Sequence, residues 1–169
     1  RQTSPMPSTS SLLAFAALAF AIIIIPGPSV MFVVTRALTY GRRAALLTVL
    51  GNAAGFYMQA LLVAVGIGAL LERSVLADAT EIQPHRSLLI DGFVVGIANP
   101  KTVVFFAAVL PQYVRADGAP AGVQMAVLGL VFMAVALASD SVWGLAAGTA
   151  RTWFARSPRR LEQLGGAGG

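Results

Sequence analysis

The chain has 169 residues, of which 57% are hydrophobic and only 11% are charged. Soluble globular domains typically carry about 25% charged residues, so the composition excludes a soluble protein and indicates an integral membrane protein. The net charge of +5 does not indicate nucleic-acid binding, because the polar surface needed for it is missing and the arginines lie at the ends of apolar segments, as in membrane anchoring.

Four apolar segments are long enough for a helix to cross about 30 Å of hydrocarbon, which takes about 20 residues. They are residues 12–35, 44–71, 88–114 and 121–150. The sequence between the second and third segments is polar and too short for a further helical span. We therefore predict an all-α polytopic transmembrane helix bundle with four spans, which forms a single transmembrane domain over residues 1–169.

The first segment is interrupted by Pro26, Gly27 and Pro28. A proline inside a helix removes a hydrogen bond and clashes with the preceding turn, at a cost of about 3 kcal/mol. Irregular backbone at membrane depth persists only where it is buried in protein or lines a wet cavity. We therefore expect these three residues to form an unwound segment that contacts a polar substrate, with a simple packing kink as the alternative.

The third segment contains a matching interruption at Asn99, Pro100 and Lys101. Freed backbone groups at this break are expected to contact the same substrate as those of the first break. Lys101 lies deep in its segment, where its ammonium group is expected to attract a substrate carboxylate; the alternative is that it extends toward the membrane interface.

The two interruptions belong to a weak internal repeat. When Pro28 is aligned with Pro100, "PSVMFVVTRALTYGRR" lies over "PKTVVFFAAVLPQYVR", and each copy is followed by a glycine-rich apolar segment. The two halves are residues 12–71 and 88–150. Broken helices in corresponding positions of two repeats are the best sequence indication of a transporter's binding site.

Three polar side chains within the apolar segments have different expected roles. Asp140 follows a long uncharged stretch, and a carboxylate inside the membrane is by default a functional residue; we expect it to bind a proton, unless its span ends early and it only reaches the interface. Asn52 is expected to contact the substrate or to hydrogen-bond across helices. Asp91 is expected to flank a helix start and to remain solvated.

No pattern indicates enzyme chemistry. The chain has no cysteine and a single histidine, which excludes disulfides and thiolate catalysis and leaves no metal-ligating or nucleophile–base set. We therefore expect no metal, no cofactor and no enzymatic activity.

The arginines conflict with the number of spans. The positive-inside rule places the loop with Arg36, Arg42 and Arg43 in the cytoplasm, together with the basic tail 151–169. Three spans separate these two regions, and an odd number cannot return the chain to the same side. We therefore expect that one helical crossing is missing between about residues 72 and 86, and its presence would also make the two halves inverted repeats.

Three stretches resemble the LysE/RhtB superfamily of bacterial amino-acid exporters. They are "PGPSVMFVVTRALTYGRRAALLTVLGNAAG", "GFVVGIANPKTVVFFAAVLPQYV" and "LGLVFMAVALASDSVWGLAAGTAR". The resemblance covers most of residues 12–165, and its most specific elements are the Pro-Gly-Pro and the later "NPK…LPQ". It implies a six-helix 3+3 inverted repeat in the bacterial inner membrane, with the third and sixth helices absent from this sequence.

The resemblance implies export of amino acids or related small metabolites from the cytoplasm, driven by the proton gradient. The expected partners are a small zwitterion and the lipid bilayer, with a homo-oligomer as a further expectation. Two other readings remain open: a transport-inactive remnant or structural membrane subunit, and a four-helix exporter that works as a dimer.

Overall fold

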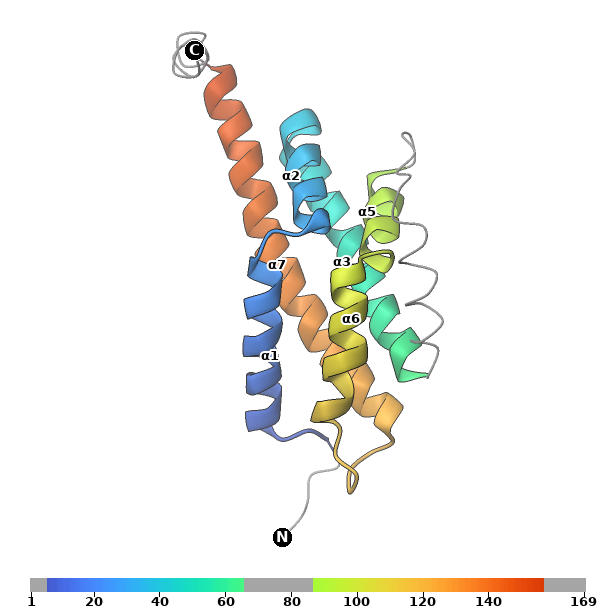
Figure 1. The fold of residues 1–169 in the computed structure, drawn as a ribbon. Helices are drawn as coiled ribbons and strands as arrows, with labels where there is room; N and C mark the ends of the chain where they lie inside the picture. Colours follow the sequence, from blue (N-terminus) through green and yellow to red (C-terminus); the bar gives the residue numbers. More distant parts are fainter. Residues whose placement is uncertain (1–5, 66–86, 157–169) are drawn as a thin grey trace.

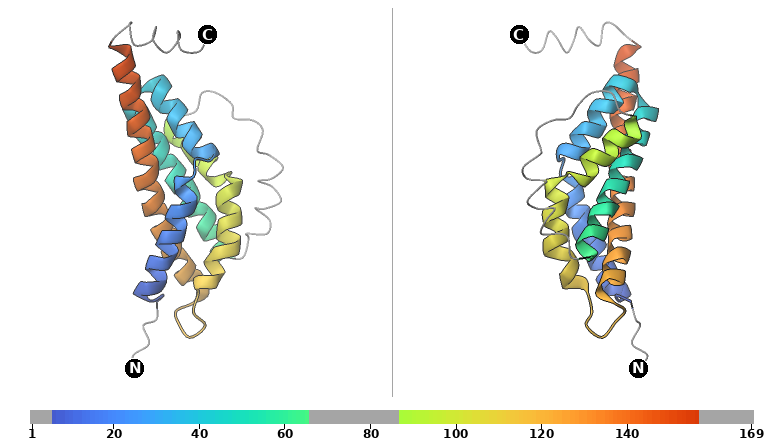
Figure 2. Two further views of the ribbon diagram at one scale, coloured as in Figure 1. Left: turned by 60° about the vertical axis from the view of Figure 1, so that its left-hand side comes forward. Right: turned by 90° about the vertical axis from the view of Figure 1, so that its right-hand side faces the viewer.

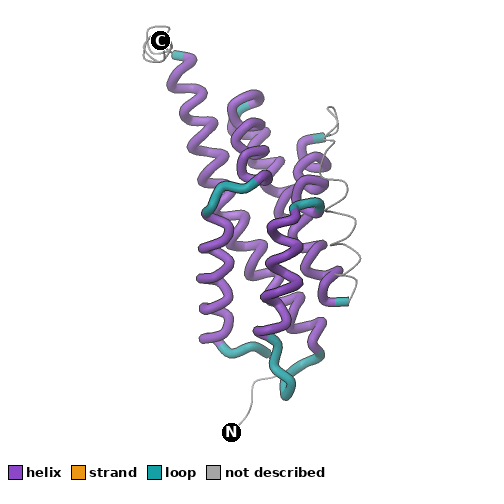
Figure 3. The backbone as a smooth tube through the Cα atoms, viewed as in Figure 1, coloured by secondary structure: helices purple, strands orange, loops and turns teal. Residues whose placement is uncertain are grey.

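The computed structural model describes residues 6–65 and 87–156, and every regular element in these ranges is helical (Figures 1 and 3). The elements are α1 (Thr9–Ile24), α2 (Pro28–Tyr40), α3 (Arg42–Ala64), α5 (Leu88–Ile97), α6 (Pro100–Val109), the 3₁₀ helix η1 (Leu110–Tyr113) and α7 (Ala121–Ala155). The predicted all-α membrane bundle is confirmed.

Two of the predicted spans are bent pairs of helices. α1 and α2 meet at an angle of 58°, and α5 meets the segment formed by α6 and η1 at 48°. Both second helices begin with proline, Pro28 in α2 and Pro100 in α6. Proline suits the first position of a helix because its missing N–H would have no partner there. The breaks therefore lie where the prolines predicted them.

The other two spans, α3 and α7, are continuous helices long and apolar enough to cross a membrane alone. With each bent pair as one span, the described residues provide up to four crossings. α3 follows α2 after a single residue, Gly41, whose φ of +87° permits the tight reversal. Glycine adopts this left-handed conformation without the steric cost that a Cβ atom brings.

The two bent pairs run in opposite directions (Figures 1 and 2). α1 and α2 lead from the N-terminal end of the bundle to the opposite end, whereas α5 and α6 lead back. α3 and α7 are likewise antiparallel to each other. This is the arrangement that an inverted repeat predicts. The predicted loss of the third and sixth helices concerns residues 66–86 and the region from 157 onward, which lie outside the described residues.

The two basic regions lie at the same end of the bundle. Arg42 at the start of α3 donates a 2.9 Å hydrogen bond to Thr149 near the end of α7, and Arg151 lies beside Gly41. By contrast, α3 ends at the other end of the bundle from the start of α5 (Figure 1). The charges are therefore placed as the positive-inside rule requires, and we call this the arginine-rich end.

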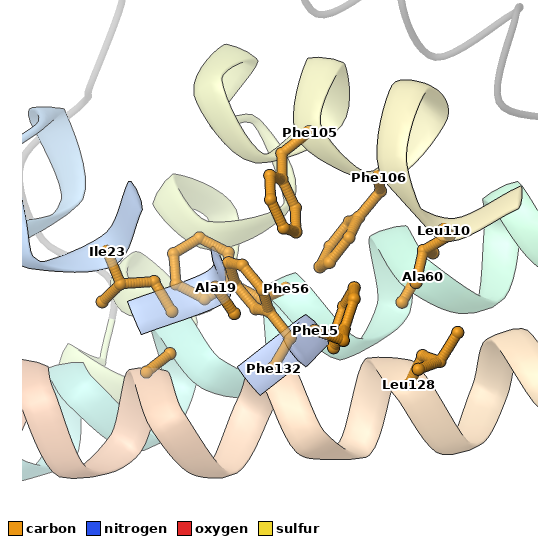
Figure 4. Close-up of a cluster of buried hydrophobic side chains, with 11 residues drawn as sticks. Phe15, Ala19, Ile23, Phe56, Ala60, Phe105, Phe106, Leu110, Leu128 and Phe132 are labelled. Carbon is orange, nitrogen blue, oxygen red and sulfur yellow. The ribbon is translucent and has the colours of Figure 1, made fainter. Parts of the chain in front are cut away.

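A cluster of aromatic rings lies between α1, α3, α6 and α7 (Figure 4), and α1 and α6 lie on the side of the breaks away from the arginine-rich end (Figure 1). Phe132 of α7 lies at its centre, with ring centroids 4.7 Å from Phe106 and 5.3 Å from Phe105, both of α6, and 5.7 Å from Phe56 of α3. Aromatic pairs are favourable at these separations. The cluster thus joins three helices, and Phe15 of α1 packs on Phe105 from the fourth.

α3 and α5 pack with their backbones in contact. Gly51 and Gly55 of α3 face Gly92 and Gly96 of α5, and a Cβ atom at any of the four would overlap the backbone of the opposite helix. In lipid, close approach through small residues is a main source of helix association. The glycines spaced four residues apart in α3 therefore meet a second such pair in α5, and the contact brings Asn52 to the centre of the bundle.

Candidate functional site

The two helix breaks are linked through Lys101. This residue is in the first turn of α6, and its Nζ donates a 2.7 Å hydrogen bond to the backbone carbonyl of Ile25 at the end of α1. Its side chain passes Gly27, where an added Cβ atom would lie 3.4 Å from the Lys101 Cδ. Lys101 of the second half therefore binds a carbonyl that the break of the first half leaves open.

Asn99 joins the starts of α2 and α6. Its Oδ1 accepts a 3.1 Å hydrogen bond from the Lys101 backbone N–H and so caps α6. Its Nδ2 donates to the Ser29 hydroxyl in the first turn of α2, at 3.1 Å. The Asn99 residue is only 3% exposed, so both bonds form in the interior of the bundle.

Gln59 of α3 satisfies the backbone at the second break. Its Nε2 donates to the Ile97 carbonyl at 2.6 Å and to the Asn99 carbonyl at 3.2 Å. The Thr102 hydroxyl lies 2.6 Å from the Gln59 Oε1 and 3.0 Å from the Asn99 carbonyl, to either of which it can donate. The carbonyls that were expected to contact substrate at this break are thus bonded within the protein.

Asp140 and Asn52 form a buried pair. Asp140 lies in the middle of α7 and is 2% exposed, and Asn52 is 1% exposed. The Asn52 Nδ2 donates a 2.8 Å hydrogen bond to the Asp140 Oδ2. Asn52 Oδ1 has no hydrogen-bond partner among the described residues. Asp140 is therefore an interior carboxylate rather than an interfacial one.

A pocket lies between the two breaks. Its wall is formed by Gly27, by the polar residues Ser29, Asn99, Lys101, Thr102 and Asp140, and by the apolar residues Ile22, Ile23, Val30, Phe56, Phe105 and Phe132. The cavity volume is about 20 Å³, which is enough for a water molecule and too small for an amino acid.

The structure brings most of the predicted site residues together. Gly27, Asn99, Lys101 and Asp140 line the pocket, and Asn52 contacts Asp140 from behind. The prolines at 26, 28 and 100 do not line the pocket and act by breaking the helices. No three potential metal ligands come together within the described part of the chain.

Two polar residues of the pocket were not predicted from the sequence. Ser29 and Thr102 are hydroxyl residues in the first turn after each break, and both line the pocket. Their shared position after a proline is the signal that marks them. A polar side chain one or two residues after a helix-breaking proline, in an otherwise apolar segment, indicates a site residue as strongly as the proline does.

Asp91 lies in the first turn of α5, at a helix start as expected, but the expectation that it remains solvated was wrong. Asp91 is 7% exposed and forms a 2.9 Å ion pair with Arg36 of α2. The reason is the close α3–α5 contact at Gly92, which draws the first turn of α5 into the bundle and away from solvent.

Comparison with known proteins finds similarity to membrane translocators. The family model for the LysE type translocator matches residues 20–80 and 72–167. A homoserine/homoserine lactone efflux protein of Salmonella typhimurium is 24% identical, over 85% of this chain and 83% of the relative. An uncharacterized membrane protein of Vibrio cholerae is 27% identical, over 90% and 87%. The uncharacterized membrane protein YrhP of Bacillus subtilis is 23% identical, over 64% and 70%. No solved structure matches the chain.

Proposed function

The chain belongs to the LysE type translocator family, and from this premise we propose that it exports a small, neutral amino acid through the pocket between its two helix breaks. The observation that carries the proposal is that Lys101 and Asp140 line the same pocket. An amino acid brings one carboxylate and one ammonium group, so a site with one cation and one anion matches a zwitterion.

The carboxylate is assigned to the side of the pocket formed by the start of α2. Gly27 is the N-cap residue of this helix and lies beside Lys101. A helix N-terminus carries a partial positive charge and unpaired N–H groups, both of which favour an anion. The Lys101 ammonium group adds a full charge, so the substrate carboxylate would replace the Ile25 carbonyl as its partner.

The substrate ammonium group is assigned to Asp140. This carboxylate already accepts a hydrogen bond from Asn52, and the unpartnered Asn52 Oδ1 offers a second acceptor nearby. A protonated amine placed there would have both an opposite charge and hydrogen-bond acceptors, which a buried charge requires.

The charges of the pocket argue for a neutral side chain. Among the described residues that line it, Lys101 and Asp140 are the charged ones, and a zwitterion uses both. The rest of the wall combines Gly27 and the uncharged polar residues Ser29, Asn99 and Thr102 with Ile22, Ile23, Val30 and three phenylalanines. A charged substrate side chain would be buried there without an oppositely charged partner, at a large desolvation cost. Two Salmonella relatives are named for efflux of homoserine and its lactone, and the side chain of homoserine is uncharged.

Proton coupling follows if Asp140 alternates between the substrate ammonium group and a proton. Both are cations that need this one buried carboxylate, so their binding is competitive. Alternating access around a fixed midplane site is how repeat-built transporters work. The arginine-rich end faces the cytoplasm under the positive-inside rule, and export then requires the pocket to open first toward that end.

The test is substrate exchange in liposomes that contain the purified chain. Labelled homoserine outside should exchange with unlabelled homoserine inside at a rate well above that of protein-free liposomes. Unlabelled threonine should compete, whereas lysine and glutamate at the same concentration should not. A chain that is a structural subunit or an inactive remnant predicts no exchange with any amino acid.

A further inference from the structure

The ion pair between Arg36 and Asp91 has no role in the substrate site described above. Arg36 is on α2 and Asp91 on α5, and the two side chains are 16% and 6% exposed. The Arg36 Nη2 donates to the Asp91 Oδ2 at 2.9 Å. The guanidinium group also lies over the ring of Phe32, 4.8 Å from its centroid, and 5.5 Å from that of Tyr40.

The pair lies between the pocket and the arginine-rich end. Arg36 is eight residues after Pro28, and Asp91 is seven residues before Ala98. At 1.5 Å per helical residue, each side chain is attached about 10–12 Å from its break. Both helices extend from the breaks toward the arginine-rich end (Figures 1 and 2).

The pair also joins the two halves of the repeat. Between the breaks and the arginine-rich end, the helices of the two bent pairs are α2 and α5. Within the described residues, the ion pair is the polar contact between these two helices. On the other side they are represented by α1 and α6, which meet through Phe15 and Phe105, with ring centroids 5.9 Å apart. The two halves thus meet through an ion pair toward the arginine-rich end and through aromatic rings toward the opposite end.

A buried ion pair is a weak source of static stability. The desolvation of both charges offsets much of their attraction, and an apolar pair of similar volume is often as stable. Here the hydrogen bonds do not fully offset the desolvation of the guanidinium group, because the Arg36 Nε is buried without a hydrogen-bond partner among the described residues. Such a pair suits a contact that forms in one conformation and breaks in another.

We propose that the Arg36–Asp91 ion pair is the gate between the substrate pocket and the arginine-rich end of the bundle. While the pair is closed, α2 and α5 are held together and the pocket is sealed from that end. When the pair opens, α2 and α5 separate, both charges become hydrated, and substrate enters. The gate rests on the proposed transport function, but its closing action can be measured without any substrate.

The chain has no cysteine, so single cysteines report accessibility without background. We choose Val30→Cys, because Val30 lines the pocket and is 3% exposed. A charged, membrane-impermeant thiol reagent is applied to oriented vesicles from the arginine-rich side. Adding Asp91→Asn should raise the modification rate about tenfold, within the range typical of coupled two-state equilibria. Exchanging the charges, Arg36→Asp with Asp91→Arg, should lower it again.

The matched control is the ion pair between Arg115 and Asp117. It has a 2.8 Å separation but is exposed and local to one loop, so Asp117→Asn should leave the modification rate at Val30→Cys unchanged. Equal rates in the Asp91→Asn and Asp117→Asn proteins would overturn the gate.

A second measurement applies even if Asp91→Asn does not fold. In the double variant Arg36→Cys with Asp91→Cys, a short bis-methanethiosulfonate reagent forms a disulfide with each thiol, releasing methanesulfinate, and so bridges α2 and α5. A reducing agent cleaves both disulfides and releases the bridge. Bridging should block exchange of homoserine, and reduction should restore it. Exchange that continues at the full rate in the bridged protein would contradict the gate, since it shows that α2 and α5 need not separate. Absence of exchange in the unmodified chain would instead contradict the proposed function, while the accessibility result still decides the gate.

Discussion

The Lys101 ammonium group is bound to the backbone carbonyl of Ile25, 2.7 Å away, so a residue of one half of the bundle completes the helix break of the other. This bond has a consequence for transport. In the proposed transport function, a substrate carboxylate that binds Lys101 would take the place of the Ile25 carbonyl, which would then lose this partner. Substrate binding would therefore loosen the first break, where α1 and α2 meet at 58°.

Lys101→Gln should weaken amino-acid binding strongly. A hydrogen bond to a charged group contributes about 1.5–3 kcal/mol, which corresponds to about a 10- to 150-fold rise in KM. The measurement is the initial rate of homoserine exchange at a series of concentrations. The control is the matching amine without the carboxylate, for which the unmodified chain and the variant should differ little. A similar KM for homoserine in both proteins would remove Lys101 from the site.

Asp140→Asn should separate proton coupling from exchange. The variant side chain can still pair with Asn52 but cannot take up or release a proton in this pH range, so export driven by a pH gradient should fall about tenfold or more. Exchange without a gradient should persist at a reduced rate. Measuring both modes in the same liposomes distinguishes a lost coupling group from a general loss of folding, which would abolish both.

Asp117→Asn is the matched control for Asp140→Asn. Asp117 is an exposed carboxylate whose pKa lies below its ordinary value, because it accepts a hydrogen bond from Arg115. A carboxylate with a lowered pKa remains ionised over the range of about pH 6 to 8 used for transport. It therefore contributes no pH dependence there, and its replacement should leave gradient-driven export unchanged.

The helix breaks could be predicted from the sequence because their cause is local. The cost of a proline is set by its own ring and the preceding turn, so Pro26, Pro28 and Pro100 mark the breaks without knowledge of the rest of the fold. The partners of the freed carbonyls are not local. Gln59 lies 40 residues from Asn99 in the sequence. The position of Gln59 in an apolar segment does not show whether it binds backbone carbonyls or forms an ordinary hydrogen bond between helices.

The misprediction of Asp91 has the same origin. A carboxylate in the first turn of a helix is favoured by the helix dipole in water, so the sequence indicates an exposed position. Its burial depends on Gly92 contacting α3 and on Arg36, which is 55 residues away. Glycines that recur every four residues in two neighbouring spans indicate such a contact, and Asp91 immediately precedes one of them.

Gln59→Leu should destabilise the second break. The substitution keeps most of the volume but leaves the Ile97 carbonyl without this donor, at about 1–3 kcal/mol for a buried group. The Asn99 carbonyl keeps the Val103 N–H as a donor and adds little to the loss. The measurement is the midpoint of thermal unfolding in detergent. The control is Gln112→Leu, since Gln112 also donates to a backbone carbonyl, that of Ala108, but at an exposed position. Equal shifts for the two variants would contradict the role assigned to Gln59.

Gly92→Ala should disrupt the contact between α3 and α5. Its Cβ atom would overlap the Thr48 carbonyl of α3, and since backbone cannot move aside as a flexible side chain does, the helices must separate. Overpacking of this kind costs about 1–3 kcal/mol, and separation would also displace Asn52 from Asp140. Gly122→Ala is the control, because its Cβ would lie at an ordinary 3.4 Å from the Ala64 carbonyl and alanine favours a helix by about 0.5–1 kcal/mol over glycine. The midpoint of thermal unfolding should therefore fall for Gly92→Ala and stay level or rise for Gly122→Ala. A Gly92→Ala protein as stable as the unmodified chain would show that α3 and α5 do not pack this closely.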